Sequence, residues 1–184
     1  MAYLRSTGLN TVSYPAGHVL QTAFSQKTDT LDVNGASSTG WFDVPSLSAS
    51  LTPASTSNKI LVMVQLNVGA NHYTQGIMLK VLRDVNSAGY GEVSYRGNTQ
   101  DSRARVIGGF EEIGGADNDF LYNLFPIPAQ FLDSPATALV TTYKVQINVS
   151  ATGGYGFVNR TGSDANSTNI PRGASSITLM EISQ

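Results

Sequence analysis

The chain has 184 residues, a formal net charge of −2 and 13% charged residues, against a globular average of about 25%. This length indicates one domain, which buries about 70% of its unfolded surface and can form a core unaided. The chain contains no cysteine, which excludes disulfides and thiolate–metal sites. It also lacks a basic run, so the sequence gives no electrostatic indication of nucleic-acid binding.

The N-terminal segment has none of the features of a targeting signal. Residues 1–20 contain no apolar run of signal-peptide length and no small-residue cleavage pattern. No stretch of the chain approaches the roughly eighteen apolar residues of a membrane span. We therefore expect a protein that is made in a cytosol, stays in solution and inserts into no membrane. Residues 1–16 lack periodicity and are interpreted as an extended arm, with a single domain at 17–184.

The first half of the domain alternates between apolar and polar residues, the period of a half-buried β-strand. Leu20, Thr22 and Phe24 fall on one face of the first such segment, and Asp-Val-Asn-Gly at 32–35 indicates a turn. The alternation is clearest from Lys59, where every second residue is apolar. Strands are expected at 19–26, 41–44, 46–52, 59–68 and 76–83.

The second half continues the pattern with more interruptions. Strands are expected at 92–96, 119–132, 140–151 and 175–183, whereas 103–111 fits a strand or a frayed helix equally well. Pro126 and Pro128 place their segment at a sheet edge or at a bend. Glycines around Tyr155 indicate a loosened stretch of chain. About ten short strands without an amphipathic helix predict an all-β sandwich or jelly roll.

Several predicted strands are apolar on both faces, namely 77–82, 120–125 and 177–182. A sandwich sheet with one wet face does not need a second apolar face. Either a loop of the same chain or another copy of the chain could cover it, and we expect an obligate oligomer. Interfaces are enriched in Tyr and Phe. The candidate interface residues are therefore Phe120, Tyr122, Leu124 and Tyr143.

The sequence contains no recognisable catalytic constellation. His18 and His72 are the only imidazoles, and no Gly-x-Ser-x-Gly motif presents a serine. We expect no catalytic residue, no cofactor and no metal site, hence no enzyme. One acidic cluster is interpreted as a solvated loop, with an ion contact or glycan depolymerase activity as alternatives. Its members are Glu111, Glu112, Asp117 and Asp119.

Surface loops offer the remaining candidates for function. Arg103 and Arg105 share a face if their segment is extended, and they are either solvated or able to grip a sulfate or sugar acid. Tyrosines beside glycine-rich turns, followed by a polar loop, suit recognition of a sugar or protein, because they combine a flat apolar face with directed hydrogen bonds. The alternative is that they are ordinary loop tips. The candidate receptor contacts are Tyr90, Tyr95, Tyr155, Asn159, Arg160 and Asp164.

Several segments together resemble one known group of proteins. They are PAGHVLQ at 15–21, SLSASLTP at 46–53, SNKILV at 57–62, DSPAT at 133–137, YKVQ at 143–146, and the closing Asn159-Arg with RGASSITLMEI at 172–182. The pattern resembles the C-terminal knob domains of tail-fibre and related appendage proteins of tailed bacteriophages, of the type common in marine phages. The similarity covers 15–184, and the closing motif is its most specific part.

This resemblance implies a homotrimeric jelly roll, like the tumour necrosis factor fold, that binds host-surface glycans or proteins. It also implies a virion protein, assembled in the host cytoplasm and located on the tail or another appendage. The arm would anchor the knob in a second virion protein, with Tyr3, Leu4 and Arg5 as candidate anchor residues. The alternative role is that of a capsid decoration or head-fibre protein.

Overall fold

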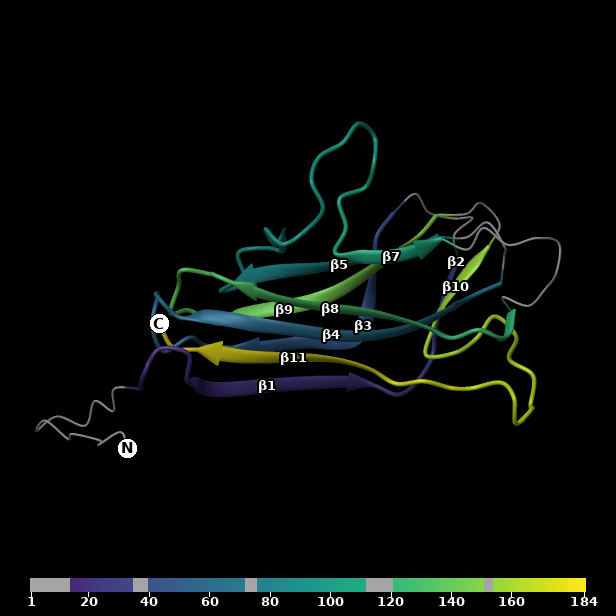
Figure 1. Cartoon of the computed structure of the whole chain (residues 1–184), viewed down its shortest axis with the longest axis horizontal. Coiled ribbons are helices and arrows are strands. Elements are labelled where there is room, and N and C mark those ends of the chain that lie inside the picture. Colours follow the sequence, from purple (N-terminus) through teal and green to yellow (C-terminus); the bar gives the residue numbers. More distant parts are fainter. Residues whose placement is uncertain (1–13, 35–39, 72–75, 112–120, 151–153) are drawn as a thin grey trace, which may run out of the picture.

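The computed structural model describes residues 14–34, 40–71, 76–111, 121–150 and 154–184. These segments form two antiparallel β-sheets that pack face to face (Figure 1). No helix within them is long and apolar enough to cross a membrane.

The first sheet has the strand order β8-β4-β11-β1. Two short strands, β10 and β2, continue it beside the second half of β4, because β11 pairs with β4 only as far as Gln65 and β10 takes over from Val68. The bounds are β1 Val19–Lys27, β2 Leu31–Asn34, β4 Lys59–Ala70, β8 Phe125–Asp133, β10 Tyr155–Val158 and β11 Ser175–Ile182.

The second sheet has the order β3-β9-β5, with β6 and β7 pairing to opposite ends of β5. Its bounds are β3 Phe42–Leu51, β5 Gly76–Val85, β6 Gly91–Glu92, β7 Gly108–Glu111 and β9 Thr141–Val149. All pairs are antiparallel, and the chain passes repeatedly from one sheet to the other. The predicted all-β jelly-roll sandwich is confirmed.

The core lies between the sheets and follows the predicted alternation. Every second residue of β4 from Ile60 to Val68 is buried, and so is every second residue of β9 from Tyr143 to Val149. Tyr143 was expected at an interface between copies. This expectation is wrong, because its ring is 0% exposed within one chain and its hydroxyl donates to Asp133 Oδ2 at 2.7 Å. Arg83 Nη1 also lies 2.6 Å from that carboxylate oxygen.

Two strands are missing from the sequence-based prediction. β2 occupies most of the predicted turn at 32–35, and β10 lies where glycines indicated a loosened chain. Each is four residues long, and they pair with one another, Tyr155 opposite Asn34 and Val158 opposite Leu31. Their β-structure therefore depends on a partner more than 120 residues away in the sequence rather than on local pattern.

Other boundaries differ for local reasons. The two strands predicted at 41–44 and 46–52 are one strand, β3, whose register shifts between Asp43 and Ser48. Pro45 cannot donate a ladder hydrogen bond, and Ser46 adopts a φ of 66°, which together make a bulge. The open segment 103–111 contributes strand only from Gly108, and 92–96 only at Glu92.

The segment predicted as a strand at 119–132 becomes one only at Phe125. Within the described residues, β8 pairs with β4 alone, so it is an edge strand, as its prolines indicated. Pro126 and Pro128 are two residues apart and both point outward. An edge strand leaves alternate N–H groups unpaired, and for this reason it accepts both prolines.

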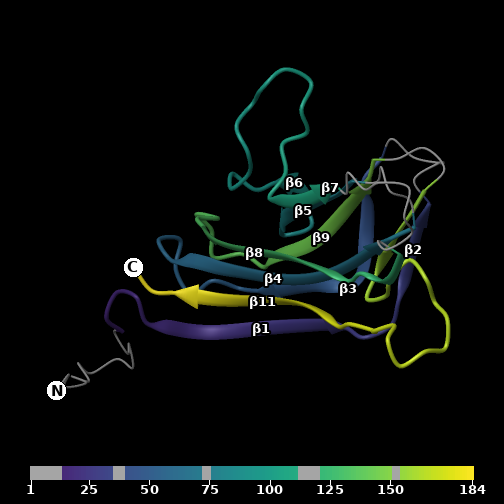
Figure 2. The same ribbon diagram turned by 45° about the vertical axis from the view of Figure 1, so that its right-hand side comes forward.

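The two ends of the sandwich differ. Figure 1 shows the described chain entering at the same end as its C-terminus, here called the near end, while β2 and β10 lie at the opposite, far end. Figure 2 shows the loop between β6 and β7 projecting away from both sheets, while the ends of this segment, residues 93–107, stay packed, with Val93 buried in the core and Ile107 packed against it.

Candidate recognition site and assembly surface

The far end carries a stack of aromatic rings and one arginine on the outward side of β10. Tyr155 and Phe157 are two residues apart on one strand, so both point away from the core. Their rings are parallel, with centroids 6.2 Å apart and planes 6° apart. The Arg160 guanidinium carbon lies 3.6 Å from the centre of the Phe157 ring. Phe157 is thereby covered to 3% exposure, whereas Tyr155 remains 39% exposed.

The paired strand β2 holds this stack in place. Asp32 lies directly opposite Phe157 and accepts two hydrogen bonds from Arg160, at Nε and Nη2, each 2.9 Å long. The hydrogen bond from Arg160 lowers the pKa of the Asp32 carboxyl, with a further contribution from the charge of Arg172. Asn34 Nδ2 donates to the Tyr155 hydroxyl at 3.2 Å. The stack therefore presents a fixed, ionised and partly apolar surface.

Asn159 positions Arg160 from below. Its Nδ2 donates to the carbonyls of Lys27 and Asp29 at 2.8 and 3.0 Å, and its Oδ1 accepts from Ser175 Oγ at 2.6 Å. Asn159 was expected to contact a receptor. That expectation is wrong, because the side chain is 0% exposed and ties the corner after β1 to the loop after β10. Its φ of 63° turns the chain outward at this point.

The loop between β10 and β11 supplies the exposed polar residues of the far end. Asp164 is exposed and pairs with Arg172. The loop is tied to the segment before β8, because Ser163 N donates to the Leu121 carbonyl at 2.7 Å. Tyr122 and Leu124, two of the expected interface residues, lie in this segment. Tyr122 is exposed within one chain, and Leu124 is half-buried beside Gly173.

The structure separates the other two tyrosines from this stack. Tyr90 follows the turn after β5, which ends at the near end, and the Lys144 ammonium lies 4.1 Å from its ring centre. Tyr95 stacks on Phe131 with centroids 5.1 Å apart and planes 8° apart. It covers the edge of the core between the sheets while about half of its surface stays exposed. Of the six predicted receptor contacts, Tyr155 and the largely buried Arg160 belong to this stack, and Asp164 is linked to it through Arg172, which pairs with Asp164 and forms a β-bridge with Arg160.

The outward face of the first sheet is free of charge over three rows of side chains. Strand register places four residues, one from each of β8, β4, β11 and β1, side by side in every row. The rows are Leu132, Leu61, Met180, Thr22; then Gln130, Met63, Thr178, Phe24; then Pro128, Gln65, Ser176, Gln26. Phe24, on the face predicted for its strand, is 61% exposed. A shallow groove of about 490 Å³ runs over Met63 and Pro128.

The outward face of the second sheet provides a contrast. It carries Asp43 and Lys144, which pair at 2.9 Å, together with Lys80 and Asp84. A solvated surface is typically about 25–35% charged. The second sheet fits that description and the first does not. We refer to the twelve residues in the three rows as the uncharged face.

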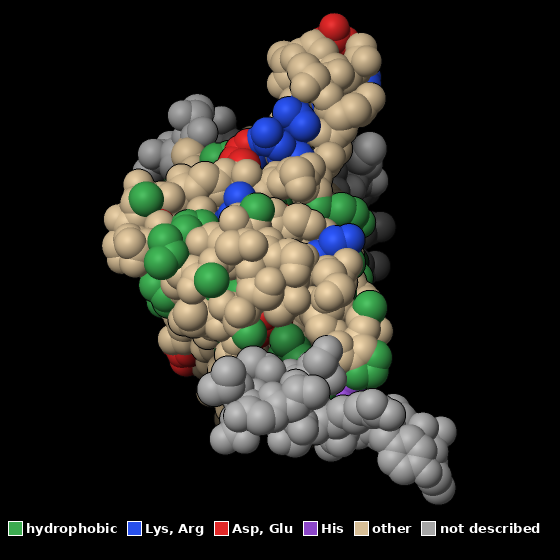
Figure 3. Space-filling view, turned by 90° about the vertical axis from the view of Figure 1, so that its left-hand side faces the viewer, with side chains coloured by type: hydrophobic (Ala, Val, Ile, Leu, Met, Phe, Trp, Pro, Cys, Tyr) green, Lys and Arg blue, Asp and Glu red, His purple; other side chains and the backbone are tan. Residues whose placement is uncertain are grey.

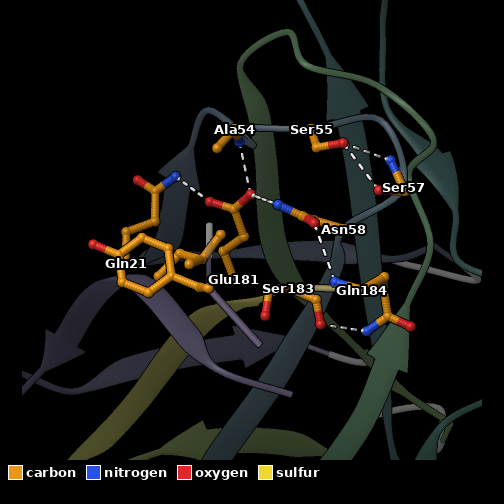
Figure 4. Close-up of a pocket in the computed structure, with 10 residues that line it drawn as sticks. Gln21, Ala54, Ser55, Ser57, Asn58, Glu181, Ser183 and Gln184 are labelled. Carbon is orange, nitrogen blue, oxygen red and sulfur yellow. Dashed lines mark hydrogen bonds between the residues drawn. The ribbon is translucent and has the colours of Figure 1, made fainter. Parts of the chain in front are cut away.

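A pocket of about 420 Å³ opens at the near end, where the chain enters and leaves the sandwich. Figure 4 shows three nitrogen donors converging on the carboxylate of Glu181: Gln21 Nε2, the Ala54 amide and Asn58 Nδ2, each at 2.6 Å. Glu181 is fully buried, and these donors hold it without a cation among the described residues. Tyr14 lines the same pocket. Hydrogen bonds to Glu181, rather than apolar contacts, therefore hold the strand and loop ends together around this pocket.

The remaining sequence candidates do not form a site in the described part of the chain. His18 stacks on Tyr14 with ring centroids 4.8 Å apart, and His72 lies outside the described residues. Of the acidic cluster, only the backbone of Glu111 is described. The anchor candidates Tyr3, Leu4 and Arg5, the interface candidate Phe120 and the acidic residues Glu112, Asp117 and Asp119 also fall outside. No group of three metal-binding side chains is found in the described ranges.

Sequence reasoning missed two members of the far-end stack. Asp32 was interpreted as part of a turn, and nothing local indicated that it faces an arginine 128 residues later. Phe157 carried a usable signal, because it follows Tyr155 at the two-residue spacing that places both rings on one side of a strand.

Comparison with known proteins gives only distant likenesses. No protein-family model matches the chain, and no curated protein matches its sequence. Among solved structures, an Eiger TNF from S. frugiperda has 11% identity over 89% of this chain and 92% of that chain, with a TM-score of 0.43. The infectious bursal disease virus Gx strain has 10% identity over 98% of this chain and 41% of that chain, with a TM-score of 0.46.

A third structure, the CBM22-1 xylan-binding domain from Paenibacillus barcinonensis Xyn10C, has 8% identity over 94% of this chain and 99% of that chain, with a TM-score of 0.32. This chain thus spans less than half of the viral chain and most of the other two. At these levels of similarity, none of the three structures informs the function of this chain.

Proposed function

We propose that this chain is a virion structural protein of a tailed phage, a three-copy knob that contacts the host surface through its far end. The observation that carries the proposal is the uncharged face, which four strands present outward without a single ionised group. In the assembly, the uncharged face of each copy is covered by a neighbouring copy of the chain. The remaining far-end loops then become the exposed part of the assembly.

A second copy of the chain is the occupant that suits the uncharged face best. The face mixes apolar side chains such as Met63 with neutral hydrogen-bonding groups such as Gln65 and Thr178. Contacts between identical subunits are depleted in charge and keep a share of polar contacts. A lipid surface would instead favour basic side chains around the apolar ones. Closed rotational symmetry allows each copy to bury this face without leaving an open end.

The far-end stack is the recognition element of the proposal. Its exposed Tyr155 ring offers a flat apolar face, while Arg160 and Asp32 provide fixed polar groups beside it. Such a combination suits a sugar ring or a protein loop of the host surface. Three weak sites on one knob would act together, because binding of the first raises the effective concentration of the others. The described chain begins with Tyr14 at the opposite, near end, and the residues before Tyr14 would dock on another virion protein.

Adsorption competition tests the recognition role. Purified chain should block adsorption of the phage that encodes it, and the Tyr155→Ala chain should block less at equal concentration. The matched control is Tyr90→Ala, which removes an equally exposed ring on the second sheet and should block as well as wild type. Equal blocking by all three chains would contradict a far-end recognition site.

Antibody labelling of intact particles tests the location. Label on the tail or on an appendage is the expected result. Label spread over the head would identify a decoration or head-fibre protein instead, and would overturn the adhesive role.

A further inference from the structure

Three basic side chains converge where the segment 93–107 leaves the second sheet. Lys80 points outward from the middle of β5, and Glu92 lies beside it on β6. Arg96 lies four residues after Glu92, and Arg105 lies near the end of the segment, shortly before β7. These residues and Tyr95 line a common crevice of only about 10 Å³, which has room for no more than a water molecule, so a larger group can contact them only across its mouth. Figure 3 shows blue side chains gathered at the base of the projecting segment, next to a red carboxylate.

The charges of this basic cluster, defined as Lys80, Arg96 and Arg105, are not balanced. Lys80 Nζ lies 2.6 Å from Glu92 Oε1, and Arg96 pairs with Oε2 of the same carboxylate. Arg105 has no carboxylate partner among the described residues and uses only its Nε, which donates to the Gly97 carbonyl at 2.8 Å. The five other ion pairs that the structure describes each join one cation to one carboxylate. Here two cations share one carboxylate, and Arg105 adds a third positive charge to the lining of the same crevice.

A second observation points to a missing acceptor. The Nε atom of Arg96 is buried and has no hydrogen-bond partner in the described part of the chain. Buried donors in proteins are almost always paired, and a bound water or ion is one explanation for an unpaired one. The Arg96 side chain as a whole is 26% exposed, so an anion from solution can reach its outer atoms, whereas the buried Nε is not itself accessible.

The surroundings of Lys80 disfavour its ionised form. The Lys80 ammonium lies 4.0 Å from the centre of the Trp41 ring, which reduces its contact with water. Burial lowers the pKa of Lys80, and the nearby charge of Arg96 lowers it further. An added negative charge would relieve both effects, because it favours the ionised ammonium.

We propose that the basic cluster binds one anionic group, a sulfate or a carboxylate, of an acidic polysaccharide. Guanidinium groups bind both oxyanions with two parallel hydrogen bonds, and Arg105 retains its terminal nitrogens for this purpose. Half-exposed Tyr95 borders the crevice and offers a surface for the adjoining sugar ring. Nucleic acid fits less well, because a net charge of −2 and an isolated cluster provide no track for successive phosphates.

This site is independent of the proposed function, since it lies on the second sheet and would bind an anion whether or not the far-end loops contact a host. Titration calorimetry at constant ionic strength tests it, with three probes: a heparin-derived hexasaccharide, an oligogalacturonate hexamer and neutral maltohexaose. Binding of either acidic oligosaccharide supports the site, and the pattern tells sulfate from carboxylate. Binding of neither, or equal binding of maltohexaose, would overturn it.

Charge-matched variants distinguish binding at this site from nonspecific electrostatic attraction between the protein and the acidic oligosaccharide. Arg105→Gln should weaken binding of the acidic probe by about tenfold or more, the effect of losing one charge-assisted contact. Lys80→Gln should weaken it in the same direction and serves as the second variant should Arg105→Gln unfold. Arg103→Gln removes the same charge from an exposed side chain that forms no ion pair in the described part of the chain, and should change affinity less than twofold. Equal losses in Arg103→Gln and Arg105→Gln would overturn the site.

Discussion

At the scale of single residues, buried polar side chains define the ends of this sandwich. Asn159 at the far end and Glu181 at the near end are both 0% exposed, and each accepts or donates three side-chain hydrogen bonds. Neither could be recognised from sequence, because their partners come from other strands and loops. The alternation of β11 even places Glu181 on its core-facing side, where a carboxylate is unexpected.

Replacing Glu181 by glutamine should destabilise the chain, because one carboxylate oxygen becomes an amide donor that faces another donor. We expect the free energy of unfolding to fall by about 1–3 kcal/mol, the cost of an unsatisfied buried group. Urea unfolding, followed by the fluorescence of the single tryptophan Trp41, measures it. The control Asp164→Asn breaks an exposed pair and should cost less than about 1 kcal/mol. Equal midpoints for Glu181→Gln and wild type would contradict this account of the near end.

Tyr143 should make stability depend on alkaline pH. Burial raises the pKa of its hydroxyl, and the neighbouring Asp133 charge raises it further. A raised pKa in the folded state means that the stabilisation is complete below the ordinary tyrosine pKa of about 10 and is lost as pH rises above it.

Wild type should therefore lose up to about 1.4 kcal/mol per pH unit above pH 10 from this group alone. Tyr143→Phe should be less stable by about 0.5–1.5 kcal/mol at neutral pH, through loss of the hydrogen bond, but should show a shallower alkaline decline. Urea unfolding at several pH values measures both effects. Tyr90→Phe, at an exposed position, should follow the wild-type slope, and a Tyr143→Phe profile parallel to wild type would refute the assignment.

At the scale of elements, the sequence predicted those strands in which apolar and polar residues alternate. Every second residue is buried from Ile60 to Val68 in β4 and from Tyr143 to Val149 in β9, and β11 was placed to within one residue. The short strands β2 and β10 were missed, because four residues give too little period and their pairing is set by the tertiary fold. The far-end stack was missed in part for the same reason, since it exists only once these two strands meet.

In β3, the backbone conformation of one residue interrupts the regular strand and produces a bulge. Ser46 has a φ of 66°, a conformation that β-branched residues rarely adopt. We expect Ser46→Val to lower the free energy of unfolding by about 1–3 kcal/mol. Ser48→Val, two residues along on an ordinary exposed strand position, should be neutral or slightly stabilising. Similar unfolding curves for the two valine variants would rule out a strained bulge at Ser46.

At the scale of the whole molecule, the two sheets have different outward faces. The second sheet is charged and also carries the basic cluster, while the first is uncharged across four strands. The sequence predicted doubled apolar strands at 77–82, 120–125 and 177–182, but only the last lies on the uncharged face. Which outward side chains share a row depends on strand register, and the register is set by pairings between distant segments.

The molar mass of the purified chain in solution tests the central claim most directly. Light scattering should give three times the chain mass of 19.5 kDa for wild type. Met63→Glu places a charge in the middle row of the uncharged face and should yield single chains, whereas Ser48→Glu on the second sheet should leave the mass unchanged. A wild-type chain that remains at 19.5 kDa over the accessible concentration range would contradict a three-copy knob assembled through this face.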